Sequence, residues 1–145
     1  MMRLNIEYPI DREAYEFKNS LNGLDKGIKA LAAMLNRNGK GEVFFGVSKE
    51  GDVTGLKGQI GVETIKMVEE RISEVLKPAV TPTTIIEEYS GKKVIHVIVK
   101  GNDKPYAANG DYRIRIEDGN KKIDPELMAK LFYESDRTAL DSIES

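Results

Sequence analysis

Apolar residues recur at helical spacing in the first third of the chain. Leu24, Ile28, Leu31 and Leu35 are separated by four, three and four residues, which places them on one face of a helix. The pattern predicts a helix over residues 24–37 with this face turned towards a core.

The same spacing returns later and predicts a second helix over residues 62–77. Pro78 ends it, because a proline cannot continue a helix. Its outer face is largely acidic, which argues against contact with nucleic acid on that side. A last helix opens at Asp124-Pro125, where an aspartate caps free N–H groups and a proline suits the first helical position.

Short β-rich runs between turn residues predict the strands. Residues 42–48 read as a strand buried on both faces, and Ser90-Gly91 joins two further runs in a hairpin. The remaining predicted strands span residues 14–20, 52–56 and 111–117. This order predicts an α+β fold in which about three helices pack on a mixed sheet with antiparallel hairpins.

Composition narrows the possible classes of function. The chain has 145 residues, which suits one compact domain over residues 1–135 followed by a polar tail, 136–145. It has no cysteine, so disulfides, thiolate zinc sites and cysteine nucleophiles are excluded. No apolar run reaches the ~20 residues of a membrane span, and the start of the chain lacks the apolar segment of a signal peptide. We expect a cytoplasmic protein with no membrane partner and no cofactor.

The charge balance limits how the chain could bind nucleic acid. The formal net charge is −2 and the isoelectric point is about 5.6. Such a protein is not a uniformly basic nucleic-acid binder, so any such site is a local patch of lysine and arginine.

The segment Asn38-Gly39-Lys40-Gly41 raises the question of a phosphate-binding loop. A nucleotide loop lies between a strand and the N-terminus of a helix, whereas here the helix comes first and the strand follows. The C-terminus of a helix also repels phosphate. The loop is therefore interpreted as a glycine cap, with the side chains of Arg37 and Lys40 as candidate phosphate contacts.

Two further motifs suggest contacts with nucleic acid. In "YRIRI", Arg113 and Arg115 share one face of a strand about 7 Å apart, the scale of neighbouring phosphates. A solvated face, or pairing with Glu87 and Glu88, is the alternative. In "GNDKPY", Lys104 lies in an extended loop and Tyr106 is placed to stack on a base.

Acidic residues and the single histidine complete the candidate chemistry. Asp11 and Glu16 could share a divalent metal that activates water, although five residues apart on a regular strand they would point to opposite faces. Solvated acids are the alternative. His96, inside "VIHVIV", is interpreted as a satisfied sheet histidine rather than a catalytic one.

Taken together, these stretches resemble the Schlafen AlbA-type domain, often described as DNA-binding. The resemblance covers most of the chain in the family's order, and a helix ending in "MLNRNGKGE" followed by "FFGV" and "VTG" is its most specific part. The matching pieces are "YEFKNS" (15–20), "IKALAAMLNRNGKGEVFFGVSKEGDVTGL" (28–56), "KVIHVIVKGNDKPYAANGDYRIRIED" (93–118) and the helix from Asp124.

The resemblance implies a compact α+β domain that often forms the N-terminal part of proteins described as transcriptional regulators or ATP-binding proteins. In the animal Schlafen branch, a related fold binds structured RNA, and three acids cleave tRNA and rRNA. Two of these acids fall on Asp11 and Glu16. The third falls where this chain has Ser48 and Lys49, with Glu50 and Asp52 nearby as substitutes.

Three functional hypotheses follow. The leading hypothesis is a nucleic-acid-binding module without robust catalysis. Such a module would be a transcriptional regulator or the N-terminal domain of one. Its predicted contacts are Lys18, Arg37, Lys40, Lys104, Tyr106, Arg113 and Arg115. The second is an endoribonuclease for structured RNA such as tRNA, in which Asp11 and Glu16 hold Mg²⁺ or Mn²⁺. The third is an assembly domain that forms a homodimer through a sheet edge.

Overall fold

The computed structural model describes residues 14–135, which form two four-stranded sheets and three α-helices. The first sheet is mixed, because its first two strands run parallel and the others antiparallel. Its order is β1 (Tyr15–Lys18), β2 (Lys40–Phe45), β5 (Lys92–Lys100) and β4 (Thr83–Tyr89).

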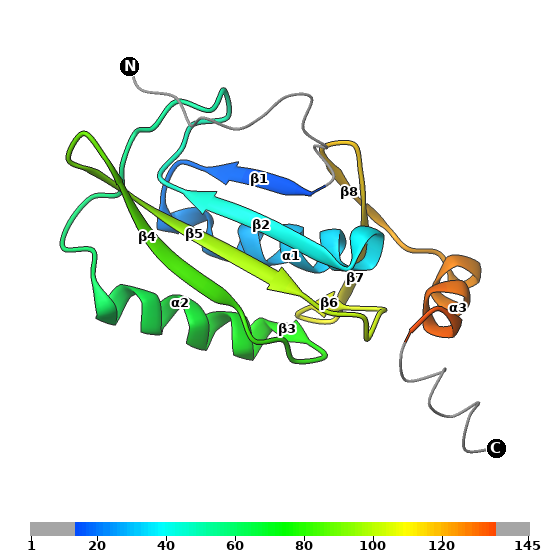
Figure 1. Cartoon of the computed structure of the whole chain (residues 1–145). Coiled ribbons are helices and arrows are strands. Elements are labelled where there is room, and N and C mark those ends of the chain that lie inside the picture. The colour runs from blue at the N-terminus through cyan, green and yellow to red at the C-terminus, as the bar shows by residue number, and fades with distance from the viewer. Residues whose placement is uncertain (1–13, 136–145) are drawn as a thin grey trace.

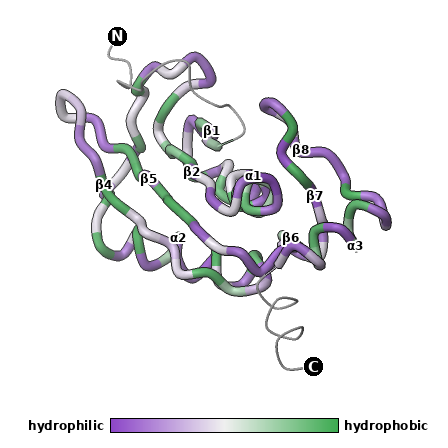
Figure 2. Tube along the Cα trace, turned by 45° about the vertical axis from the view of Figure 1, so that its right-hand side comes forward, coloured by the Kyte–Doolittle hydropathy of each residue, from purple (hydrophilic) through white to green (hydrophobic). Residues whose placement is uncertain are grey.

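The second sheet is smaller and antiparallel along its length. Helix α1 (Leu24–Asn38) lies between the two sheets, as Figure 1 and Figure 2 show from two directions. The other elements are β3 (Leu76–Lys77), β6 (Ala107–Ala108), β7 (Asp111–Ile116), β8 (Gly119–Lys122), α2 (Val62–Val75), α3 (Pro125–Tyr133) and a 3-10 turn at Leu21–Gly23. The predicted α+β class, mixed sheet and three helices are confirmed for the described residues.

Helix α1 begins and ends where its sequence indicates. All four residues of the predicted apolar face are buried. Gly39 follows the helix in the left-handed conformation, with φ of 74°, and its N–H donates to the carbonyl of Leu35. The Asn38–Gly41 segment is therefore a helix cap that leads into β2.

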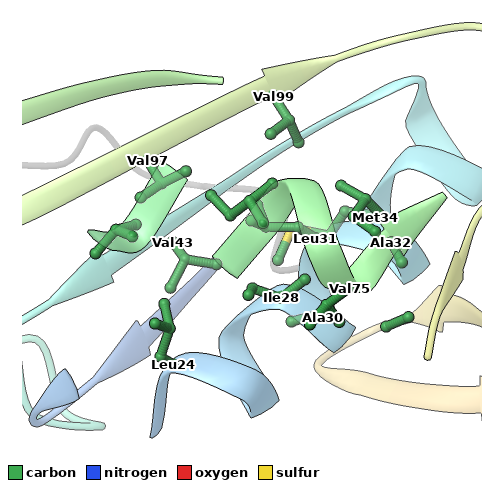
Figure 3. Packing of buried hydrophobic residues seen from close by; sticks show 14 of the residues in the cluster. Leu24, Ile28, Ala30, Leu31, Ala32, Met34, Val43, Val75, Val97 and Val99 are labelled. Carbon is green, nitrogen blue, oxygen red and sulfur yellow. The ribbon is translucent and has the colours of Figure 1, made fainter. Parts of the chain in front are cut away.

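The main core fills the space between the first sheet and the helices. Ile28 and Leu31 of α1 pack there with Val43 of β2, Val97 of β5 and Val75 of α2 (Figure 3). The helix is buried on more than one side because the second sheet covers it as well. Burial of each such side chain contributes roughly 1.5–3 kcal/mol.

Some sequence expectations differ from the structure. The predicted strand 52–56 is reduced to a bridge between Val47 and Val53, because Gly51 and Gly55 on either side of that bridge have positive φ and interrupt the extended backbone. The predicted helix 62–77 ends at Val75, because Leu76 and Lys77 pair with β6 as strand β3, and strands β6 and β8 were not predicted either. They are short or polar and gain their order from pairing with neighbours. Within residues 14–135, no helix is long and apolar enough to cross a membrane.

Candidate functional site

A cleft of about 420 Å³ opens where β1 and β2 end together. Three segments distant in sequence line it. They supply Glu16, Phe17, Lys18 and Asn19 from β1 and the residue after it, Lys49 from the turn after β2, and Asp118 from the turn between β7 and β8. Both signs of charge therefore face the same space.

The backbone at Gly46 holds this cleft together. The carbonyl of Lys18 accepts hydrogen bonds from the N–H groups of Gly46, at 2.7 Å, and Val47, at 3.1 Å. Gly46 has φ of 106°, and a Cβ there would lie 3.1 Å from the carbonyl oxygen of Lys93. A glycine is thus required where β2 gives way to the loop that lines the cleft.

Glu16 is neutralised by two cations. Its Oε1 accepts a hydrogen bond from Arg115 at 2.8 Å, and its Oε2 lies 3.1 Å from the Nζ of Lys18. Both carboxylate oxygens are therefore engaged. Three positive charges and two carboxylates therefore meet at this cleft. The cations are Arg115, Lys18 and Lys49, and the carboxylates are those of Glu16 and Asp118.

The buried side chain of Arg115 connects the two sheets through its hydrogen bonds. Its side chain is 0% exposed, and besides Glu16 it donates to the carbonyl of Tyr15 at 3.0 Å and to Oδ1 of Asn120 at 2.9 Å. A guanidinium sealed in this way cannot reach a phosphate. This corrects the prediction that Arg115 contacts nucleic acid.

Tyr106 is also buried, with 1% of its surface exposed. Its backbone N–H donates to Oδ1 of Asn36 at 2.6 Å, and Nδ2 of Asn36 returns a bond to the Tyr106 carbonyl at 2.9 Å. The same Nδ2 also donates to the carbonyl of Arg113. The ring cannot stack on a base in this position, which corrects the prediction for Tyr106. Sequence reasoning missed Asn36, since its position within an apolar helix pattern gave no sign of its partners.

The remaining predicted cations of this region are engaged with acids. The Nε of Arg113 donates to Asp111 at 2.9 Å, and Lys29 of α1 shares the same carboxylate. Lys104 lies 3.5 Å from Glu134. The two arginines of "YRIRI" both donate to Asn120, but Arg115 is buried whereas Arg113 is half-buried.

Arg37 and Lys40 lie at the other end of the first sheet. Both are exposed. Lys18 stands opposite Phe45, five residues beyond Lys40 along β2, which is roughly 17 Å at the rise of a strand. Lys100, which the sequence reasoning did not single out, faces Lys40 across the β2–β5 pair. Arg37 and Lys40 therefore lie apart from Lys18.

His96 is held within the first sheet by acidic neighbours. Its Nε2 is 2.6 Å from Oε1 of Glu42, its Nδ1 is 3.5 Å from Glu87, and its ring stacks on Phe44 at 4.0 Å. The hydrogen bond with His96 lowers the pKa of Glu42, against an opposing effect of partial burial. Nε2 is thus paired with Glu42, whereas the buried Nδ1 has no hydrogen-bond partner among the described residues, so the interpretation of a satisfied sheet histidine holds for one ring nitrogen.

Comparisons with known proteins identify the family to which this fold belongs. A family model described as Schlafen, AlbA_2 matches residues 11–124. The chain belongs to the Schlafen AlbA_2 family. No curated protein matches the chain.

Two solved structures are similar. The DIP2311 protein from Corynebacterium diphtheriae matches with a TM-score of 0.66 and 18% identity, covering 85% of this chain and 24% of that one. The N-terminal domain of an ATP-dependent DNA helicase RecG-related protein from Nitrosomonas europaea matches with a TM-score of 0.48 and 17% identity, covering 80% of each chain. At such identities the likeness to DIP2311 supports the fold alone.

Of the acids that the resemblance to the Schlafen nuclease branch implies, Glu16 lines this cleft. Asp11 lies outside the described residues, and Lys49 faces the cleft near the position of the third acid. Neither Glu50 nor Asp52 lines it. Asp118 does, but sequence reasoning had no signal for it, since it lies at a turn far along the chain. No group of three or more potential metal ligands gathers among residues 14–135.

Proposed function

We propose that this member of the Schlafen AlbA_2 family binds nucleic acid without cleaving it, as a transcriptional regulator or its N-terminal domain. The observation that carries the proposal is the cleft in which Glu16 is neutralised by Lys18 and Arg115. Lys49 adds a cation there that forms no ion pair with any residue of 14–135. A phosphate fits this excess of positive charge.

The same contacts argue against the nuclease alternative. A metal at Glu16 would displace Arg115 or Lys18 from the carboxylate, and Lys49 would repel it. Incubation of labelled tRNA with Mg²⁺ or Mn²⁺ is expected to leave the RNA intact. Cleavage by the wild-type chain that disappears in Glu16→Gln would overturn this part of the proposal.

Charge variants test the cleft as the binding site. We expect Lys49→Glu to weaken binding of a fluorescent single strand at least fivefold at 50 mM salt. Asp118→Asn, which removes a repulsive charge from the same cleft, is expected to strengthen binding. Lys66→Glu makes the same charge change as Lys49→Glu on the exposed face of α2, so it serves as the matched control.

Fluorescence anisotropy measures all four affinities in one buffer. Equal losses for Lys49→Glu and Lys66→Glu would mean that only the net charge matters and that the cleft is not the site. Absence of binding by the wild-type chain to DNA, RNA and tRNA at 50 mM salt would refute the proposal altogether.

A further inference from the structure

A second cleft of about 540 Å³ adjoins the first, and the two share Asn19. One wall is the segment that leads into α1, and the other is the loop that follows the bridge between Val47 and Val53. The lining residues are Asn19, Ser20, Leu21 and Asn22 on one wall, and Thr54, Gly55, Leu56 and Lys57 on the other.

The walls combine apolar surface with free amide groups. Leu21 and Leu56 are half-buried, and each packs one flank on the main core while it lines the cleft. The side-chain amides of Asn19 and Asn22 have no hydrogen-bond partner within residues 14–135. An asparagine side chain both donates and accepts, which matches the edge of a nucleobase, and apolar side chains suit its flat face.

Positively charged side chains line both clefts. Lys18 and Lys49 line the first cleft, and Lys57 lines the second without an ion pair in the described part of the chain. A polynucleotide has the same combination, since each base lies between two phosphates. The charges and the apolar walls are thus complementary to a short unpaired strand.

The wall formed by Thr54, Gly55 and Leu56 is held in place by backbone hydrogen bonds. The carbonyl of Gly46 accepts from the N–H groups of Thr54 and Gly55, each at 2.9 Å, and the N–H of Leu56 donates to Lys93 at 2.8 Å. Because Gly46 also binds the carbonyl of Lys18, one residue connects the two clefts. A groove that is already formed loses little entropy when a ligand enters.

We propose that the second cleft receives an unpaired base of a single-stranded nucleic acid whose adjacent phosphate lies in the first cleft. This inference rests on the proposed function and adds the substrate class to it. A duplex keeps its bases paired and stacked, so it cannot fill the second cleft without losing a base pair.

Abasic oligonucleotides separate the base from the phosphates. A ten-nucleotide single strand, an otherwise identical strand with abasic sites, and the duplex of the first strand are titrated with the full chain at 50 mM salt. We expect the intact single strand to bind about tenfold more tightly than the other two, in the range of one base contact.

Asn22→Ala is expected to remove most of that preference, because it deletes an exposed amide that lines only the second cleft and the neighbouring surface. Asn102→Ala, an exposed asparagine outside both clefts, is the matched control and should keep the preference. Circular dichroism checks that both variants fold.

The outcomes distinguish the two proposals. Equal affinity for intact and abasic strands, or a duplex that binds as tightly as the single strand, overturns the base-binding cleft and leaves the proposed function standing. A preference that Asn22→Ala leaves unchanged also overturns it. If none of the three probes binds, the proposed function fails and this inference fails with it.

Discussion

Replacement of Arg115 by methionine tests the connection between the two sheets. Methionine keeps much of the volume but removes the charge and the bonds to Tyr15, Glu16 and Asn120. Removal of one partner from a buried ion pair costs about 3–5 kcal/mol. Glu16 is 18% exposed and keeps Lys18 as a partner, so we expect the lower end, about 3 kcal/mol.

Urea unfolding measures this loss. With a slope of about 2 kcal/mol per molar, the midpoint is expected to fall by roughly 1.5 M without a change in slope. Arg113→Met is the matched control, because that side chain is 30% exposed and its partner Asp111 keeps Lys29. We expect it to cost about 1 kcal/mol or less.

A double-mutant cycle with Glu16→Gln isolates the pair. The double variant is expected to lose at least 1 kcal/mol less free energy of unfolding than the two single variants lose together. If Arg115→Met lowers stability no more than Arg113→Met does, Arg115 does not connect the two sheets. The prediction that Arg115 contacts phosphate would then stand.

Three further perturbations probe the scaffold. The hydrogen bond with His96 lowers the pKa of Glu42, so its contribution to stability is present above the unfolded pKa of about 4.5 and is lost as the pH falls. Urea unfolding should therefore show that Glu42→Gln lowers the stability of the chain at pH 7 and has little effect at pH 3. An equal loss of stability at both pH values would contradict the stabilising role of the Glu42–His96 bond. Gly46 has φ of 106° and close neighbours, so we expect Gly46→Ala to lower the free energy of unfolding by about 2–3 kcal/mol. Gly58 has φ of 85° and nothing within 4 Å, so Gly58→Ala should lower it by about 1 kcal/mol. Similar melting temperatures for the two variants would refute the packing argument. Asn36→Ala leaves a buried N–H of Tyr106 without its acceptor and should cost about 2–4 kcal/mol by thermal unfolding, and a loss under 1 kcal/mol would contradict that role.

Local signals account for the parts of the fold that the sequence predicts well. The spacing of Leu24 to Leu35 and the glycine at position 39 specify α1 and its end, and Ser90-Gly91 specifies the β4–β5 hairpin with φ of 51° and 80°. Each of these features depends on residues close together in the chain.

Long-range contacts decide what the sequence could not. The alternation of "YRIRI" gives two faces for β7 but does not say which one is buried, because the partner of Arg115 lies 99 residues away at Glu16. The partner of Tyr106 lies 70 residues away at Asn36. The alternation alone is compatible with an exposed Arg115, whereas the fold supplies this residue with an acid and two further acceptors.

The salt dependence of binding shows whether the lysines of the two clefts contact the phosphates of a nucleic acid. If Lys18, Lys49 and Lys57 meet three phosphates of a single strand, the slope of log affinity against log salt is about −2, and affinity falls roughly 20-fold between 50 and 200 mM salt. We expect this fall for the wild-type chain. Equal affinity at the two salt concentrations, or no binding at 50 mM, would contradict phosphate binding by these lysines.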